Sequence, residues 1–144
     1  MLETVLLLVD DEVGFVETFS KRLKKRNFTV YTAYSGKEAL DRLKEHSSID
    51  VVILDVLMPV MDGIETLKEI KKHYPLVEVI MLSGHATIES AIEGMKLGAF
   101  DYLMKPCDLD ELTEKVKQVK KKRNAHKRKI LEAQMQNIAL RRGV

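Results

Sequence analysis

The chain has 144 residues, of which 45% are hydrophobic and 32% are charged, with a net charge of +2. This composition excludes wholesale disorder, and the length fits one globular domain with a short appendage that folds without a disulfide or metal. The single cysteine, Cys107, excludes an intramolecular disulfide, and the longest early apolar run, Val5 to Val9, is too short for a signal peptide or a membrane span. We therefore expect a cytoplasmic protein without a membrane segment.

Short apolar runs rich in valine, isoleucine, leucine or aromatic residues recur along the first three quarters of the chain. Such runs are typical of strands that are buried on both faces of a sheet. They are Thr4–Val9, Thr29–Ala33, Val51–Leu54, Glu78–Leu82 and Phe100–Met104.

Amphipathic stretches with apolar residues three to four positions apart separate these runs and predict helices. Their apolar positions are Phe15, Val16, Phe19 and Leu23, then Ala39, Leu40 and Leu43, then Ile64, Leu67 and Ile70, then Ile88, Ile92 and Met95. Capping-box spacing marks helix starts at the pairs Ser35 and Glu38, Asp62 and Glu65, and Asp108 and Glu111. Five strands alternating with five helices predict an α/β fold with a parallel sheet covered on both faces.

Polar residues follow four of the expected strands. The first strand runs into Asp10 and Asp11, the third into Asp55, the fourth into Ser83 and the fifth into Lys105. Because ligands of such sheets bind outside the carboxyl ends of the strands, we expect these side chains to share one crevice. Neighbouring carboxylates repel one another, so a resident cation is expected, and oxygen ligands without clustered His or Cys favour Mg²⁺ or Mn²⁺.

This combination of groups suits phosphoryl transfer. A divalent ion and an ammonium can neutralise phosphoryl oxygens while an aspartate oxygen attacks the phosphorus. Each acid taken alone is equally well explained as a helix cap, but that explanation does not account for acids on several strand ends. A rival in the enzyme class is a Mg²⁺-dependent phosphatase of the haloacid-dehalogenase type. Such an enzyme needs an aspartate two residues after its nucleophile, whereas Glu12 follows Asp10 at that spacing.

Four motifs resemble the receiver domain of bacterial two-component response regulators, over residues 1 to about 120. They are Leu8-Val9-Asp10-Asp11-Glu12, Leu54-Asp55-Val56-Leu57-Met58-Pro59-Val60-Met61-Asp62-Gly63, Ser83-Gly84-His85 and Tyr102-Leu103-Met104-Lys105-Pro106. The stretch from His85 through Leu112 is most similar to receivers of nitrogen-regulation-type enhancer-binding activators. The resemblance implies a flavodoxin-like, doubly wound five-stranded sheet with strand order 2-1-3-4-5 and an extended C-terminal helix.

The resemblance also implies roles for the acidic residues. Asp55 would be the phospho-acceptor. Asp10, Asp11 and Asp55 would hold Mg²⁺ together with the backbone carbonyl of Leu57, with Asp11 as a direct ligand and Asp10 acting partly through water. The protein would then be a signalling switch rather than an enzyme, since the only reaction would be self-catalysed phosphoryl transfer to Asp55.

Three further roles follow from the same resemblance. Lys105 would pair with the phosphoryl group and be followed by a cis peptide bond to Pro106. Ser83 would donate its hydroxyl to a phosphoryl oxygen, and Tyr102 would be the aromatic residue whose ring turns inward when the loop after Ser83 moves. The phosphodonor would be a histidine kinase, and the output would be dimerisation and regulation of transcription.

The C-terminal part of the chain is strongly basic. Residues 115–144 carry 11 Lys+Arg and one acid, whereas residues 1–114 carry 13 Lys+Arg and 21 Asp+Glu. The absence of Pro and Gly between Asp108 and Gly143 predicts one long helix. Its heptad register runs through Leu109, Leu112, Val116, Val119, Arg123, His126, Ile130, Ala133, Asn137 and Leu140. Polar seam positions, and an offset apolar line at Leu131, Met135 and Ile138, predict a shift of register or a break near residues 121–129.

We divide the chain into a receiver, residues 1–121, and a basic helical linker, residues 122–144. Three interpretations of the linker stay open. It forms a coiled coil that makes a homodimer through the fifth helix, it is a solvated connection to an output domain missing from this chain, or its basic residues bind nucleic acid. The linker has no base-reading module and no aromatic residue, which makes direct nucleic-acid binding the least supported of the three. We expect the chain to be a fragment of a longer regulator.

Overall fold

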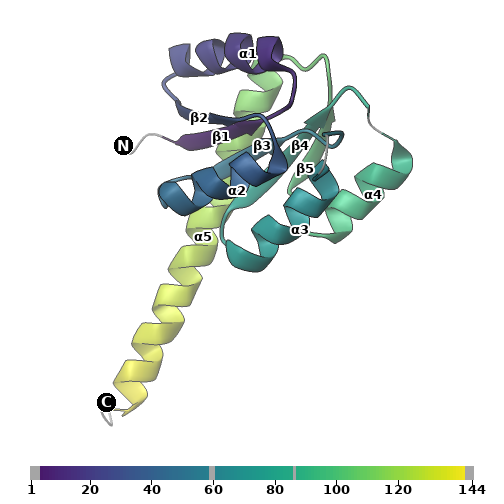
Figure 1. Ribbon diagram of the computed structural model, residues 1–144. Helices are drawn as coiled ribbons and strands as arrows, with labels where there is room; N and C mark the ends of the chain where they lie inside the picture. Colours follow the sequence, from purple (N-terminus) through teal and green to yellow (C-terminus); the bar gives the residue numbers. More distant parts are fainter. Residues whose placement is uncertain (1–3, 59–60, 86, 142–144) are drawn as a thin grey trace.

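The computed structural model describes residues 4–58, 61–85 and 87–141. Five strands pair in parallel in the order β2-β1-β3-β4-β5, as the resemblance to receiver domains implies (Figure 1). In chain order the elements are β1 (Val5–Val9), α1 (Val13–Lys25), β2 (Thr29–Ala33), α2 (Gly36–Glu45), β3 (Val51–Leu54), α3 (Gly63–His73), β4 (Glu78–Ser83), α4 (Ile88–Lys96), β5 (Asp101–Met104) and α5 (Leu109–Arg141).

Helices cover both faces of the sheet. Because successive side chains of a strand point to opposite faces, Leu7 and Val9 pack with α2 and α3, whereas Leu6 and Leu8 pack with α1 and the first turns of α5. The central strands β1, β3 and β4 are therefore almost completely buried. This burial explains their continuous apolar sequence and fixes the direction in which the strand ends present their polar residues.

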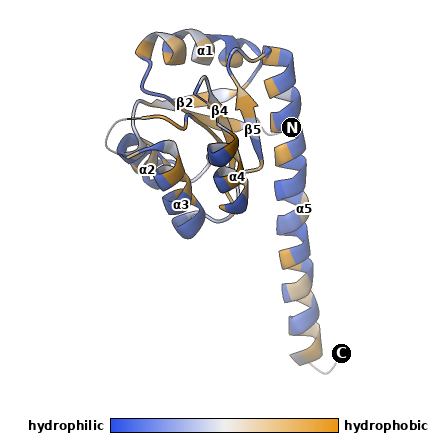
Figure 2. Cartoon of the chain, turned by 90° about the vertical axis from the view of Figure 1, so that its right-hand side faces the viewer, coloured by the Kyte–Doolittle hydropathy of each residue, from blue (hydrophilic) through white to orange (hydrophobic). Residues whose placement is uncertain are grey.

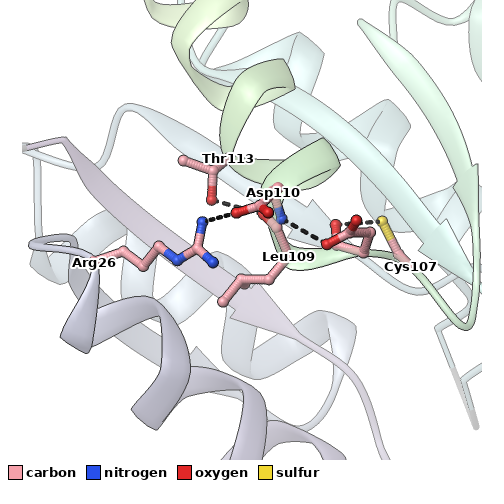
Figure 3. A network of polar contacts seen from close by, with 6 residues as sticks. Arg26, Cys107, Leu109, Asp110 and Thr113 are labelled. Atoms are coloured by element: carbon pink, nitrogen blue, oxygen red, sulfur yellow. Dashed lines mark hydrogen bonds and ion pairs between the residues drawn. The ribbon is translucent and has the colours of Figure 1, made fainter.

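Helix starts depend on short polar contacts. Ser35 and Asp62 each accept a hydrogen bond from the backbone N–H three residues later, at 3.1 and 2.8 Å, as the capping-box spacing predicts. At α5 the carboxylate of Asp108 instead accepts the N–H of Asp110, at 3.0 Å. Asp110 also forms an ion pair with Arg26 at the end of α1 (Figure 3). This network links the start of α5 to α1. In the first turn Asp108 pairs with the N–H of Asp110, whereas the capping-box spacing predicted a pairing with Glu111.

The helix α5 continues unbroken beyond the sheet to Arg141 (Figures 1 and 2), so a break near residues 121–129 is wrong, whereas the alternative, a shift of heptad register there, stays a prediction. Arg123 occupies this region and is not a seam residue. Its guanidinium donates to the Asp50 carboxylate at 2.6 Å and to the carbonyl oxygen of Leu76 at 2.8 Å. Lys120 approaches the same carboxylate at 3.7 Å. These contacts hold α5 against the amino edge of the sheet.

A second buried acid, Glu78, attracts cations at the same edge. Lys122 and Lys71 lie 3.7 and 3.8 Å from its carboxylate oxygens. Beyond these contacts α5 exposes large apolar side chains at Ile130, Leu131, Met135, Ile138 and Leu140. None of the helices in the described part of the chain combines the length and apolar character needed to cross a membrane.

Candidate functional site

Three carboxylates meet at the carboxyl edge of the sheet. Asp10 and Asp55 directly follow β1 and β3, and Asp11 is the next residue after Asp10. One oxygen from each of the three lies within 4.8 Å of the others. Asp10 and Asp55 are 1% and 2% exposed, whereas Asp11 is exposed. The structure therefore brings the predicted acids together in a pocket that is open to solvent on the Asp11 side.

The carboxyl group of Asp55 is in an unfavourable environment for its charge. Burial raises its pKa and the charge of Asp10 adds to the rise, while the hydroxyl of Ser83 and the charge of Lys105 lower the pKa without cancelling the effect. Oδ1 of Asp55 is buried and has no hydrogen-bond partner among the described residues. A buried acceptor without a partner is costly, and a cation would relieve that cost. Because the donors are all carboxylate oxygens, the pocket fits Mg²⁺ or Mn²⁺.

Lys105 places an ammonium group beside the acids. Its Nζ donates to Oδ2 of Asp10 at 2.5 Å and lies 3.6 Å from Oε1 of Glu12. Burial lowers the pKa of Lys105, but the hydrogen bond to Asp10 and the charges of Asp10, Asp55 and Glu12 outweigh burial and raise it. The lysine is therefore a permanent cation at this edge. The peptide bond from Lys105 to Pro106 is cis, as expected.

Ser83 is the last residue of β4 and is completely buried. Its hydroxyl oxygen accepts the backbone N–H of His85 at 3.1 Å, and its carbonyl oxygen accepts the N–H of Lys105 at 3.0 Å. The hydroxyl also lowers the pKa of Asp55. Ser83 thus contacts the loop that follows β4 as well as the acidic pocket.

Tyr102 on β5 lies on the side of the sheet covered by α4. Its hydroxyl is 3.1 Å from Oγ of Ser90 in the first turn of α4. The same Ser90 hydroxyl accepts the N–H of Thr87, and Thr87 Oγ1 accepts the N–H of Ser90, which completes a capping box that the sequence analysis missed. Tyr102 therefore contacts the start of α4 rather than the acidic pocket. The predicted inward rotation of its ring stays a prediction.

Gly63, at the start of α3, lies very close to the backbone of Asp55 and Val56. Its N–H donates to the carbonyl oxygen of Val56 at 2.7 Å, and a Cβ added at Gly63 would lie only 2.1 Å from the backbone oxygen of Asp55. The side chain of Leu57 is 57% exposed, and the proposed role of its backbone carbonyl in metal binding stays a prediction. Pro59, which belongs to the motif around Asp55, lies outside the described residues.

One contributor to the site was missed from sequence. Phe15, which appeared only as an apolar position of a helix, places its ring under Lys105 with 3.9 Å between Nζ and the ring centroid. Glu12, which belongs to the motif at the end of the first strand, is the second carboxylate near the same ammonium. Cys107 comes two residues after Lys105 in the chain, and burial and the charges of Glu111 and Asp108 raise the pKa of its thiol, which disfavours the reactive thiolate.

Comparisons with known proteins agree with this geometry. Residues 6–117 match the family described as "Response regulator receiver domain". The "Transcriptional regulatory protein ZraR" of Salmonella typhimurium is 41% identical over 109 residues, which are 76% of this chain and 24% of that protein. The "Putative response regulator NtrX-like" of Rickettsia felis is 40% identical over 114 residues, covering 78% of this chain and 24% of the relative. The chain thus spans about a quarter of the length of these relatives.

Solved structures show the same architecture. A response regulator receiver domain protein from Clostridium thermocellum superposes with a TM-score of 0.81 at 36% identity, covering 85% of this chain and 98% of that chain. NtrX from Brucella abortus superposes with a TM-score of 0.82 at 29% identity, covering 92% of this chain and 30% of that chain. The longer match to NtrX extends the likeness into the part of α5 that leaves the sheet.

Proposed function

The chain belongs to the response regulator receiver domain family, and from this premise we propose that it accepts a phosphoryl group on Asp55 from a histidine kinase in a Mg²⁺-dependent reaction. The observation that carries the proposal is the environment of Asp55. Its buried carboxylate has an oxygen without a hydrogen-bond partner among the described residues, beside two further acids and the ammonium of Lys105. This environment disfavours a lone carboxylate and favours a bound cation beside it, which the phosphoryl transfer would use.

The protein's own groups suffice to orient the transfer. A carboxylate oxygen of Asp55 attacks the phosphorus, and the bond from phosphorus to the donor atom breaks as the new O–P bond forms. Lys105 can exchange its contact with Asp10 for one with a phosphoryl oxygen, and the Ser83 hydroxyl can donate to another. Asp10, Asp11, Asp55 and the carbonyl of Leu57 would hold Mg²⁺, which would supply additional positive charge for the phosphoryl oxygens.

The partners that follow are a histidine kinase as phosphodonor and an output domain outside this chain. The relatives are about four times as long as the segment they share with it, and the one named a transcriptional regulatory protein supports transcription as the regulated process. The phosphoryl group carries roughly −1.5 to −2 charges and replaces the single negative charge of the carboxylate. Ser83 acts on Asp55 and accepts the N–H of His85 in the loop that leads to α4, so it can transmit the change to Ser90 and Tyr102.

The alternative function, binding of nucleic acid through the basic arm, is less well supported by the contacts of α5. In the basic run Lys120-Lys121-Lys122-Arg123 of α5, three of the four side chains, Lys120, Lys122 and Arg123, lie near buried carboxylates of the receiver. Cations committed to such ion pairs contribute less to the counterion release that drives phosphate binding.

The experiment that tests the proposal is mass spectrometry of the intact protein after incubation with acetyl phosphate. In Mg²⁺ we expect a mass increase of one phosphoryl group, located on Asp55 after proteolysis. In EDTA we expect no increase, because the uncompensated acids repel the incoming anionic donor. An adduct that forms equally in EDTA, or on another residue, would contradict the proposal.

We further propose that the exposed apolar residues of α5 pair with those of a second copy. A chain that ends after Arg123 keeps the Asp50 contact but loses Ile130, Leu131, Met135, Ile138 and Leu140. Because burial of these side chains is the expected driving force for association, the shortened chain should sediment as a monomer at concentrations where the full chain is dimeric. A full chain that is monomeric, or a shortened chain with unchanged dimer content, would rule out pairing through the arm.

A further inference from the structure

The ammonium of Lys105 is surrounded by partners of two kinds. Two are carboxylates, Asp10 at 2.5 Å and Glu12 at 3.6 Å. The third is the ring of Phe15, whose centroid lies 3.9 Å from Nζ. Phe15 stands in the first turn of α1, and Lys105 directly follows β5, so the contact joins two elements that are about ninety residues apart in sequence.

The Phe15 ring is held in place from behind. It stacks on Phe19 one helical turn later, with 5.0 Å between ring centroids and an angle of 19° between planes. Phe19 is itself buried in the core between the sheet and α1. A lysine side chain has a long flexible stem, and a fixed aromatic face restricts where its ammonium can lie.

Carboxylate and aromatic partners differ in their effect on the charge of the Lys105 ammonium. A carboxylate neutralises the ammonium, whereas an aromatic face attracts it through the ring quadrupole and leaves its charge intact. A lysine held only by Asp10 would have to break its main contact before it could reach a new anion. A lysine that also rests on a ring keeps one favourable contact while its N–H groups change partner.

We propose that Phe15 is a positioning residue for phosphorylation. Its ring holds the Lys105 ammonium at the edge of the acidic pocket while the ammonium exchanges its hydrogen bond to Asp10 for one to the phosphoryl group on Asp55. The inference rests on the proposed function of Asp55. It predicts that the contribution of Phe15 to the reaction acts through Lys105 and requires an aromatic face.

The test is a double-mutant cycle on the rate constant of labelling by acetyl phosphate in Mg²⁺. Phe15→Leu keeps an apolar side chain but removes the ring, and should slow labelling about three- to tenfold, within the range of a partly desolvated cation–π contact. Phe15→Tyr keeps the ring and should label at the wild-type rate; Phe15 and Lys105 both border a hollow of about 400 Å³. In a Lys105→Met background, Phe15→Leu should cause no further slowing.

Two results of the cycle would overturn the inference. One is that Phe15→Leu slows the Lys105→Met protein by the same factor, which a general packing defect would produce. The other is that Phe15→Tyr is as slow as Phe15→Leu. If the wild type itself is not labelled, the proposed function fails instead, and the contact is then judged by NMR alone.

The NMR measurement uses the ε-methylene protons of Lys105 in EDTA without any phosphodonor. The ring current of Phe15 should move them upfield in the wild type and in Phe15→Tyr, and they should return towards the ordinary lysine position in Phe15→Leu. Equal shifts in wild type and Phe15→Leu would show that the ammonium does not rest on the ring, and would overturn the inference whatever the labelling rates.

Discussion

Replacement of Asp55 by asparagine is expected to abolish labelling by acetyl phosphate. The amide is not an effective nucleophile towards phosphorus, and it removes one of the three carboxylates from the pocket. The matched control is Asp62→Asn, because Asp62 lies in the same β3–α3 connection and its side chain caps α3 by accepting the N–H of Glu65 at 2.8 Å. Asparagine caps helices as well as aspartate does, so Asp62→Asn should keep full labelling.

The two variants separate the site from the loop that carries it. Full labelling of Asp55→Asn would refute the assignment of the acceptor. Loss of labelling in Asp62→Asn as well would indicate that the variants disturb the loop rather than the chemistry, and intact mass spectra of both in Mg²⁺ distinguish these results.

The substitution Asp55→Asn should also increase the free energy of unfolding when EDTA is present. Because burial raises the pKa of Asp55, the folded protein holds this proton more tightly than the unfolded chain does. The wild type therefore loses stability relative to Asp55→Asn as the pH rises above about 4, the ordinary aspartate pKa, until the carboxyl is ionised in the folded state too. Urea unfolding of both proteins between pH 4 and 8 measures this difference. A difference in free energy of unfolding that shrinks with rising pH would contradict the raised pKa.

The destabilising effect of the buried Asp55 carboxylate can favour binding at the acidic pocket. Mg²⁺ that binds the folded pocket and not the unfolded chain should stabilise the wild type by mass action. A phosphoryl group on Asp55 would carry more negative charge than the carboxylate it replaces, so it would increase the need for a cation and would give Lys105 a new partner. The unfavourable environment of the unmodified Asp55 carboxylate therefore favours binding of the cation.

The sequence predicted the sheet and the acidic pocket because both depend on local patterns. Apolar runs that are buried on both faces indicate strands, and the parallel arrangement brings Asp10 and Asp55 to one edge whatever the loops do. The strand order depends on how the crossovers pack, and only the resemblance to receivers supplied it.

The contacts that the sequence did not reveal are those between elements distant along the chain. Phe15 has the spacing of an ordinary core residue, and nothing in that spacing indicates that its ring lies under Lys105. The hydroxyl contact between Ser90 and Tyr102 likewise depends on how α4 packs against β5. Such pairs are decided by tertiary geometry, which periodicity within one element does not contain.

The sequence did not reveal the role of Arg123. Its position in the heptad register suggested a polar defect in a coiled coil, which predicted a shift of register or a break in the helix. The structure instead buries its side chain to 10% exposure against Asp50. A signal was present, because Asp50 directly precedes a fully buried strand and an acid in that position needs a cation nearby. The basic cluster is therefore partly an anchor for α5 on the receiver.

Replacement of Gly63 by alanine is expected to cause the largest loss of stability among single substitutions at the site. An added Cβ would lie 2.1 Å from the backbone oxygen of Asp55 and 2.5 Å from Cα of Val56. These neighbours are backbone atoms, so no side chain can turn away to relieve the overlap, and the start of α3 or the end of β3 must move. Overpacking costs about 1–3 kcal/mol where side chains can adjust, and we expect at least the upper end of this range.

The control for this prediction is Gly14→Ala on the exposed surface of α1. A Cβ there meets no atom within 4 Å, and alanine favours a helix over glycine by up to about 1 kcal/mol. Urea unfolding should therefore show opposite changes for the same chemical substitution, with Gly63→Ala less stable and Gly14→Ala equal to or more stable than the wild type. Since any shift of the Asp55 backbone also displaces its carboxylate from Asp10 and Asp11, Gly63→Ala should be stabilised less by Mg²⁺ than the wild type. Equal unfolding midpoints for Gly63→Ala and the wild type would mean that Gly63 is not in tight contact with the backbone of Asp55 and Val56.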